Sequence, residues 1–248
     1  MVEGYHYHHG ERIHFFGDDE DGHSPFLGVE LEVDAQNSTR DVDDISDEIE
    51  EMFPRHFIWF EHDGSLSYGF ENITAPATYG YHKSIRDKYM NMFRKIVSEG
   101  LFSYNTGSCG MHVHVNKNYF TSNSQIENLL FLFDKYWDNI VIFSRRSLNG
   151  IRSWASKYNA TPHEIVEDMG FGDRYRCVNL SNSNTIEFRI FKGTLNPDVF
   201  FATLAFVDSI CRISKYSTKQ EIRRISWEDI VPDSAMDFWN KVKNRRVD

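Results

Sequence analysis

The sequence predicts an α+β fold, a single domain of antiparallel strands with helices packed on one side. Three stretches carry the strand prediction: FLGVELEVD at 26–34, CGMHVHVN at 109–116 and NTIEFRIF at 184–191. In each, apolar side chains alternate with polar ones, which is typical of a strand with one buried and one polar face. Elsewhere apolar residues recur at helical spacing. Because the chain has no repeats and no low-complexity linker, residues 1–248 are expected to form one domain.

Composition narrows the class of protein. With 40% hydrophobic and 26% charged residues, the chain resembles ordinary globular proteins. Its net charge of -10 argues against direct nucleic-acid binding. Three cysteines without a CxxC pair indicate a reducing compartment and argue against both a disulfide framework and a zinc ribbon. There is no apolar signal segment, and acidic and basic residues interrupt the most apolar helix, so we expect a cytoplasmic protein that does not contact membranes.

The first half of the chain should begin with an N-terminal arm, residues 1–25. Its five histidines make a metal-binding tract conceivable, but a loosely ordered or edge-forming arm is favoured: His6, His8, His9, His14 and His23. Apolar residues between acids predict an amphipathic helix from Val42 to Met52, ending near Pro54. Residues 56–76 predict two strands around a turn at Asp63-Gly64-Ser65. A second helix is expected over 82–99, with Gly100 just past its end.

The second half of the chain is expected to be mainly helical around the last long strand. A main packing helix should run from 121–124 to about Ser144. Residues 147–173 are less regular and predict a mobile loop over the site, with a short helix over 161–169. Asn196-Pro197-Asp198 predicts the start of another helix, because it combines a capping residue with proline at the first helical position. Residues 216–248 should form a C-terminal segment of one or two short helices.

The polar faces of the three strands carry unusual pairs. Glu30 and Glu32 share one face of the first strand, roughly 7 Å apart at a rise of ~3.3 Å per residue. The other two strands carry the pair His112 and His114, and Glu187 with Arg189. Taken singly, each pair fits a half-solvated antiparallel strand. Together they favour a functional site, because a strand face that is only exposed to solvent usually mixes Thr, Ser, Lys and Gln.

Such a set of side chains suits a divalent metal beneath phosphate groups. Mg²⁺ prefers oxygen ligands, which glutamates on different strands would supply: Glu30, Glu32, Glu71 and Glu187, with Asp63 as a weaker candidate. A neutral histidine suits a metal that also contacts phosphate, and the planar guanidinium of Arg189 suits phosphate oxygens. For the further candidates a role outside any site fits equally well: Asp63 and Ser65 as turn formers, and Arg174 and Arg176 as surface residues.

Four motifs in order give the sequence a family resemblance: GVELEV, DGSL followed by Glu71, GSCGMHVHV, and TIEFRIFKGTLNPDVF. They resemble those of the amidoligases of the glutamine synthetase and glutamate–cysteine ligase superfamily, particularly the short members often found in phages. The resemblance covers Gly28 to about Ala205. It implies a curved antiparallel sheet backed by helices, with ATP and Mg²⁺ or Mn²⁺ ions on the concave face.

The resemblance also implies roles for individual residues. Metal ligation carries over to the glutamates and the first histidine of the motifs: Glu30, Glu32, Glu71, Glu187 and His112. His114 is similar to a nucleotide contact, and Arg189 to a phosphate contact with a catalytic role. Arg174, Arg176 and Ser65 are weaker candidates for cofactor binding. Glu71 and Asp63 are further catalytic candidates, but the paired glutamates of the family's middle region reduce to these two acids here, which leaves the base on the amine side unassigned.

The implied activity is ligation of a carboxylate to an amine through an acyl phosphate made from ATP, on small-molecule or peptide substrates. A homo-oligomer fits this resemblance. The chain leaves no room for the separate N-terminal domain of true glutamine synthetases, however, so their ring assembly is not expected. Two other readings stay open, a two-metal phosphodiesterase or nuclease and a non-catalytic nucleotide-binding module. If the source is viral, the expected location is the host cytoplasm.

Overall fold

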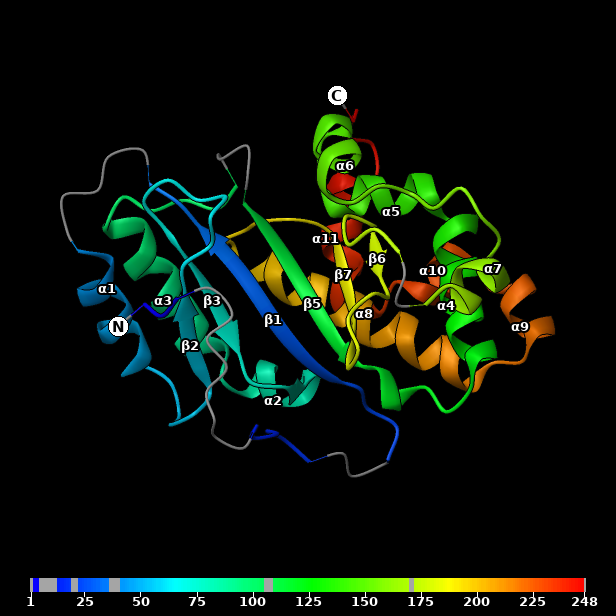
Figure 1. Ribbon diagram of the computed structural model, residues 1–248, viewed down its shortest axis with the longest axis horizontal. Helices are drawn as coiled ribbons and strands as arrows, with labels where there is room; N and C mark the ends of the chain where they lie inside the picture. The colour runs from blue at the N-terminus through cyan, green and yellow to red at the C-terminus, as the bar shows by residue number, and fades with distance from the viewer. Residues whose placement is uncertain are drawn as a thin grey trace.

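The computed structural model describes residues 2–4, 13–18, 22–35, 41–104, 109–169 and 172–247. Within these ranges, seven strands form one antiparallel sheet in the order β2-β3-β1-β5-β7-β6, with β4 pairing to one end of β1. The strands are β1 Phe26–Val33, β2 Ile58–Glu61, β3 Phe70–Thr74, β4 Ala77–Thr78, β5 Gly110–Asn116, β6 Val178–Asn179 and β7 Thr185–Lys192. Figure 1 shows β1 and β5 crossing the centre of the molecule.

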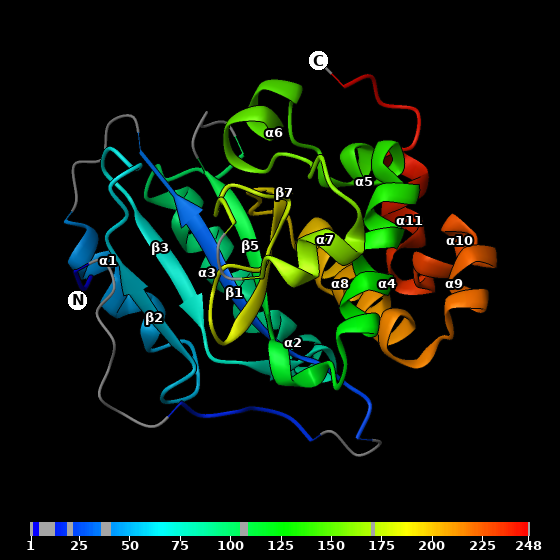
Figure 2. The ribbon, with the colours of Figure 1, turned by 45° about the vertical axis from the view of Figure 1, so that its right-hand side comes forward.

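Helices back the sheet and continue beyond its β6 edge, as Figures 1 and 2 show. In the first half they are α1 Val42–Glu50, α2 Tyr79–Ser84 and α3 Arg86–Ser98, with a short 3₁₀ turn at Lys117–Tyr119. The second half contains α4 Asn123–Lys135, α5 Trp137–Ser144, α6 Leu148–Trp154, α7 Pro162–Glu167, α8 Pro197–Tyr216, α9 Lys219–Arg224, α10 Trp227–Ile230 and α11 Asp233–Val242. The predicted α+β class, an antiparallel sheet backed by helices, is confirmed.

The alternation in the sequence sets which face of the sheet is buried. Leu27, Val29, Leu31 and Val33 of β1 are at most 1% exposed and belong to the hydrophobic core. Because neighbouring strands keep this register, the odd-numbered residues of β5 are buried with them. The opposite face of β1 carries Glu30 and Glu32. One face of the sheet therefore holds the core and the other is left for polar chemistry.

The two strands of residues 56–76 form as predicted, but the link between them is longer than a tight turn. β2 and β3 pair antiparallel, and Leu66 donates its backbone N–H to the Asp63 carbonyl within the connecting loop 62–69. The far end of this loop is fixed to β1, because the buried carboxylate of Asp34 accepts N–H groups of Ser67 and Tyr68 at 3.1 and 2.8 Å. The loop is thus tied beside the polar face.

Several helix predictions need correction. The helix expected over 82–99 is two helices that meet at Ile85, whose φ of -103° leaves the helical region. The main packing helix is likewise divided at Tyr136, with φ -110°. Both breaks lie inside continuous apolar patterns, so periodicity alone did not reveal them. Within 147–173, predicted as a mobile loop, residues 148–154 form the additional helix α6, while α7 matches the short helix expected over 161–169. The C-terminal segment forms three helices where one or two were expected.

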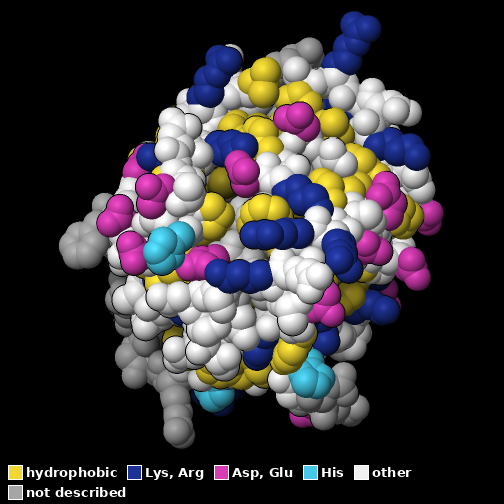
Figure 3. All heavy atoms as spheres, turned by 90° about the vertical axis from the view of Figure 1, so that its right-hand side faces the viewer, with side chains coloured by type: hydrophobic (Ala, Val, Ile, Leu, Met, Phe, Trp, Pro, Cys, Tyr) yellow, Lys and Arg dark blue, Asp and Glu magenta, His cyan; other side chains and the backbone are white. Residues whose placement is uncertain are grey.

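Two described parts of the N-terminal arm, residues 2–4 and 13–18, lie along sheet edges. Glu3 forms a bridge with Glu61 at the outer edge of β2, and Phe16 forms one with Ala77 of β4. The edge-forming prediction therefore holds for these residues, whereas His6, His8 and His9 lie outside the described residues. No described helix is both long and apolar enough to cross a membrane. On the face shown in Figure 3, basic and acidic side chains are interspersed, so it offers no continuous positive surface.

Candidate functional site

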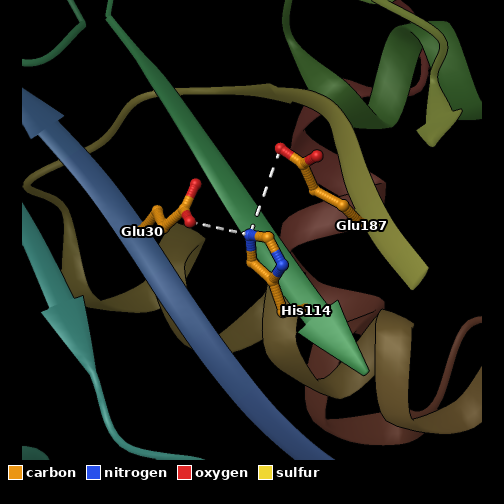
Figure 4. A group of neighbouring side chains, drawn as sticks. All are labelled: Glu30, His114 and Glu187. Carbon is orange, nitrogen blue, oxygen red and sulfur yellow. Dashed lines mark ion pairs between the residues drawn. The ribbon is translucent and has the colours of Figure 1, made fainter. Parts of the chain in front are cut away.

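Strand register brings the predicted ligand pairs together on the polar face. Glu30 of β1 pairs with His112 of β5, and His114 of β5 pairs with Glu187 of β7. Paired residues on neighbouring strands point to the same face, so side chains from three distant segments meet. Figure 4 shows Glu30 and Glu187 on either side of His114, all extending away from the sheet. The prediction that these three segments come together on one face of a sheet is confirmed.

The nitrogen and oxygen atoms of this cluster lie within a few ångströms. His114 Nε2 is 3.0 Å from Glu30 Oε1 and 4.0 Å from Glu187 Oε1. His112 Nδ1 lies 3.2 Å from Glu30 Oε2 and 3.4 Å from Glu187 Oε1. His114 Nε2 is buried and has no aligned hydrogen-bond partner. A nitrogen that faces carboxylates without a good hydrogen bond is suited to bind a ligand.

Glu71 and Glu32 extend the cluster toward β3. The two residues pair across β1 and β3, and Glu61 pairs with Glu71 from the other side. Burial, together with the charges of Glu30, Glu32, Asp63 and Glu61, raises the pKa of Glu71 well above its ordinary value. Several carboxylates that are buried close together can all stay ionised only with positive charge nearby.

His114 responds to this need for positive charge. Burial by itself would lower its pKa, but the charges of Glu30 and Glu187 outweigh burial and raise the pKa to about 9. Glu30 shows the complementary effect: burial favours its neutral form, yet His114 and His112 hold its pKa well below the usual value. The cluster thus keeps a proton on a buried histidine, in the place where a cation would serve the carboxylates.

Two overlapping groups of residues have the geometry to hold metal ions. In each group the ligand atoms lie within 4.8 Å of one another: Glu30, His114 and Glu187 in one, and Glu30, Glu71 and His112 in the other. Carboxylate oxygens suit Mg²⁺ and Mn²⁺, and the imidazole nitrogens favour Mn²⁺ or a similar transition metal. The shared Glu30 places the two groups side by side. The donor set therefore fits divalent cations of the predicted kind.

Other described groups orient these ligands. The Glu187 carboxylate accepts a hydrogen bond from Asn179 Nδ2 at 2.8 Å and is in ion-pair contact with Arg189 Nη1. Glu32 accepts the backbone N–H of Gly110. Across from His112 the register of β7 shifts, so that two of its residues, Arg189 and Ile190, face one residue of β5. This bulge lies directly beside the ion pair between Arg189 and Glu187.

Arg146 is a buried site residue that the sequence analysis did not identify. It follows the C-terminal end of α5, is 5% exposed, and donates from Nη2 to the Phe191 carbonyl at 3.0 Å. A Cβ on Gly110 would lie 2.6 Å from Arg146 Nη2 and 2.9 Å from His112 Nε2, so both side chains reach the same point. Arg146 Nε is buried without a hydrogen-bond partner. The Nε–H can therefore still donate a hydrogen bond to an anion, and the charge of Glu32 acts on the same guanidinium.

A cleft of about 640 Å³ adjoins the carboxylates on the Glu30 side. That volume is in the range of small-molecule sites. Glu30, Gly28 and His114 form its inner end, and apolar side chains form much of the rest, including Ile58, Trp59, Ile73 and Pro76. Trp59 pairs with Ile73, which pairs with Glu30, so the indole lies two strands from the carboxylates along one row of the sheet. A ligand bound at Glu30 can thus extend over apolar surface.

The remaining predicted residues lie outside the cluster. Asp63 accepts the N–H of Ser65 at 2.6 Å, so both act in the turn, although the charge of Asp63 reaches Glu71. Arg176 Nη1 donates to Ser156 Oγ and the Lys157 carbonyl, at 3.1 and 3.2 Å. Arg174 is exposed and its guanidinium stacks 5.1 Å over Tyr175. Their described contacts do not reach the carboxylates, and a phosphate role for the two arginines stays a prediction.

Comparison with known proteins gives little beyond this geometry. No protein-family model and no curated protein matches the sequence. Among solved structures, the chain is similar to PafA, the ligase of the prokaryotic ubiquitin-like protein Pup, in its complex with Pup. The likeness has 11% identity and a TM-score of 0.37, and it covers 77% of this chain and 47% of PafA, so the chain spans about half the length of PafA. At that TM-score the likeness carries no weight for function, which rests on the site itself.

Proposed function

We propose that the protein is an ATP-dependent carboxylate–amine ligase that forms an amide bond through an acyl phosphate. The observation that supports this best is the convergence of Glu30, His112 and Glu187 from three strands into two overlapping metal-binding groups. Two guanidinium groups, Arg189 and Arg146, stand at the same face, and a cleft of nucleotide size opens beside it.

The charges of the site match the needs of phosphoryl transfer. The transferred group carries negative charge on several oxygens, so catalysis depends mainly on positioning and on compensating positive charge. Glu30, Glu71, Glu187, His112 and His114 would hold divalent cations, which neutralise the phosphates and polarise their P–O bonds. Arg189, kept in place by Glu187, is suited to contact the moving phosphoryl oxygens.

The proposed reaction has two displacement steps. A carboxylate oxygen of the donor attacks the γ-phosphorus of ATP, the bond to the β,γ-bridging oxygen breaks, and ADP leaves with that electron pair. The amine nitrogen then attacks the carbonyl carbon of the acyl phosphate, inorganic phosphate leaves, and the nitrogen gives up a proton. Glu71 and Asp63 are the candidate acceptors of that proton, because Glu71 is the acid of the cluster on β3 and the charge of Asp63, in the adjoining loop, reaches it.

The two sides of the cluster suggest where the substrates lie. The cleft at Glu30 and His114 would hold the nucleotide, with the triphosphate at its inner end. On the other side, Arg146 has an unused buried N–H beside Glu32, which suits the carboxylate of the donor. Placing the donor there brings its oxygen toward the γ-phosphate and keeps the two negative groups apart by cations.

Isotope transfer tests the proposal directly. The protein is incubated with Mg²⁺ or Mn²⁺, ATP, and panels of amines and of carboxylates labelled with ¹⁸O. We expect release of ADP and phosphate that requires both substrates, and ¹⁸O from the carboxylate in the phosphate. Glu30→Gln should abolish the reaction, whereas Glu228→Gln, at an exposed position of α10, should leave it unchanged. Products without ¹⁸O in the phosphate would contradict an acyl phosphate.

The two overlapping metal-binding groups also suit a two-metal phosphodiesterase or nuclease. Such an enzyme would cleave bis-p-nitrophenyl phosphate or a nucleic acid without added nucleotide, and Arg189→Ala would leave much of that cleavage intact. A ligase would show neither property. Binding of ATP and metal without turnover for any substrate pair would instead indicate a nucleotide-binding module.

A further inference from the structure

The outer end of the cleft is built partly from the N-terminal arm. Ile13 and His14 line it, together with His56 and Arg55 from the segment just before β2. In Figure 1 the described residues 13–18 of the arm, drawn in dark blue, pass below α2. These residues are far from Glu30 in the sequence but face the same cleft. The arm therefore contributes directly to the shape of the ligand site.

Residues 16 and 17 of the arm are attached to the chain around β4 by hydrogen bonds and ring contacts. Phe16 donates its N–H to the Pro76 carbonyl at 3.0 Å and accepts the N–H of Thr78 at 3.1 Å. Its ring packs on Phe57 and Tyr81, with centroids 5.1 and 5.3 Å away. Gly17 follows with φ +84°, and a Cβ there would lie 2.4 Å from Thr78 Oγ1. These contacts fix the chain against β4 two residues after His14.

His14 stacks on His56, with ring centroids 4.9 Å apart and planes inclined by 17°. His56 adopts φ +63°, a left-handed conformation that side chains other than glycine seldom take. Unusual backbone conformations of this kind are concentrated at ligand sites. The two near-parallel rings, from separate segments, stack on each other at the edge of the cleft, so a planar ligand would extend this stack on the outer face of one ring.

The spacing to the metal-binding groups sets what this surface can contact. Trp59, Ile73 and Glu30 form one row across three strands, so Trp59 lies about 10 Å from Glu30 at ~4.8 Å per strand. A nucleoside triphosphate with its phosphates at Glu30 would carry its base over this apolar row and out to the histidine rings. Planar bases stack on aromatic side chains, histidine included.

We infer that the N-terminal arm completes the nucleotide site, and that His14 and His56 form a platform on which the purine base of a nucleoside triphosphate stacks. The inference rests on the proposed function, because it requires the triphosphate at the carboxylates. His14 is then a specificity-determining residue: it contacts the base and not the phosphates. Base stacking commonly accounts for about tenfold or more in affinity per base.

Binding of two probes to the full-length protein separates the base from the phosphates. ATP and inorganic tripolyphosphate, each with Mg²⁺, are titrated calorimetrically into the unaltered protein and into His14→Ala, His14→Phe and His23→Ala. His23 serves as the matched control, because it is in the same arm but its ring packs on Tyr216 outside the cleft. We expect His14→Ala to weaken ATP binding about tenfold and to leave tripolyphosphate binding unchanged. His14→Phe, which keeps a flat ring, should retain most of the affinity for ATP.

Each other outcome overturns the inference in a distinct way. Unchanged ATP binding by His14→Ala would show that the base lies elsewhere. Equal loss of ATP and tripolyphosphate would show that the arm only supports the fold. If the unaltered protein binds neither probe, the proposed function fails and the inference fails with it, whereas normal tripolyphosphate binding with no effect of His14 contradicts the inference alone.

Discussion

His82 of α2 is a buried histidine that contacts the strand carrying Glu30, and it gives the protein a predictable response to acid. Its Nε2 lies 2.9 Å from the Leu27 carbonyl of β1, and its Nδ1 lies 2.7 Å from the Tyr89 hydroxyl. Because a carbonyl can only accept, Nε2 carries the proton, and Nδ1 accepts from Tyr89. The ring is 0% exposed, so burial disfavours its charged form.

Burial lowers the pKa of His82 from 6.5 to about 4, although the hydrogen bond to Leu27 partly opposes this. Since the folded pKa is the lower one, the unfolded chain binds the proton more readily between these values. The contribution of neutral His82 to the free energy of unfolding is fully present above pH 6.5 and is lost as the pH drops toward 4. Between about pH 7.5 and about pH 5, this one group should reduce the free energy of unfolding by about 2 kcal/mol.

Urea unfolding at the two pH values, for the unaltered protein and for His82→Gln, measures this term. Glutamine cannot gain a charge, so the variant should be less stable at neutral pH but should lose about 2 kcal/mol less on acidification. Comparing the two proteins cancels the titration of all other groups, including His114. Parallel loss of stability in both proteins would refute the neutral, buried state of His82.

Two further predictions concern the support of the site. Gly110→Ala should weaken divalent cation binding and destabilise the protein by about 1–3 kcal/mol, because its Cβ would press on Arg146 and His112, whereas Gly64→Ala, with open space around it, should change neither in calorimetry or urea unfolding. Asp34→Asn should lower the free energy of unfolding by about 1–3 kcal/mol, since the buried carboxylate accepts N–H groups of Ala35, Ser67 and Tyr68, while the exposed Asp237→Asn should have little effect. An Asp34→Asn protein as stable as the control would show that the β2–β3 loop is held by other contacts.

The fold was predictable where the sequence has a strict period. Alternation in β1, β5 and β7 identified both the strands and their buried faces, because a half-buried strand admits little else. The breaks at Ile85 and Tyr136 were not predictable, since neither carries a proline or glycine and the apolar stripe continues through both. They depend on how the helices pack against the sheet and α8, which local propensity does not record.

The site residues likewise fall into two groups, those that a local sequence pattern predicts and those that only tertiary packing brings to the site. Glu30, His112, His114 and Glu187 stood out because each lies on a strand with a second ligand-type residue two positions away. Asn179, Arg146 and His14 carry no such signal. Asn179 is in a strand of two residues, and Arg146 reaches the site from the end of a helix. His14 lines the cleft from an arm for which a loosely ordered or edge-forming role was favoured over metal binding.

This division has a physical basis that bears on the function. Side chains of a strand alternate between the two faces of the sheet, so the sequence shows which residues share the polar face and lie close together. Residues that reach the site from loops and helix ends are free of that constraint, and here Arg146 and His14 lie at opposite sides of the metal-binding groups, beside Glu32 and at the outer cleft. Under the proposed function, the strands would carry the chemistry common to any phosphoryl transfer, while the loops and the arm would select the substrates. Substrate specificity should therefore change through substitutions at positions such as 14 and 146 without loss of metal binding.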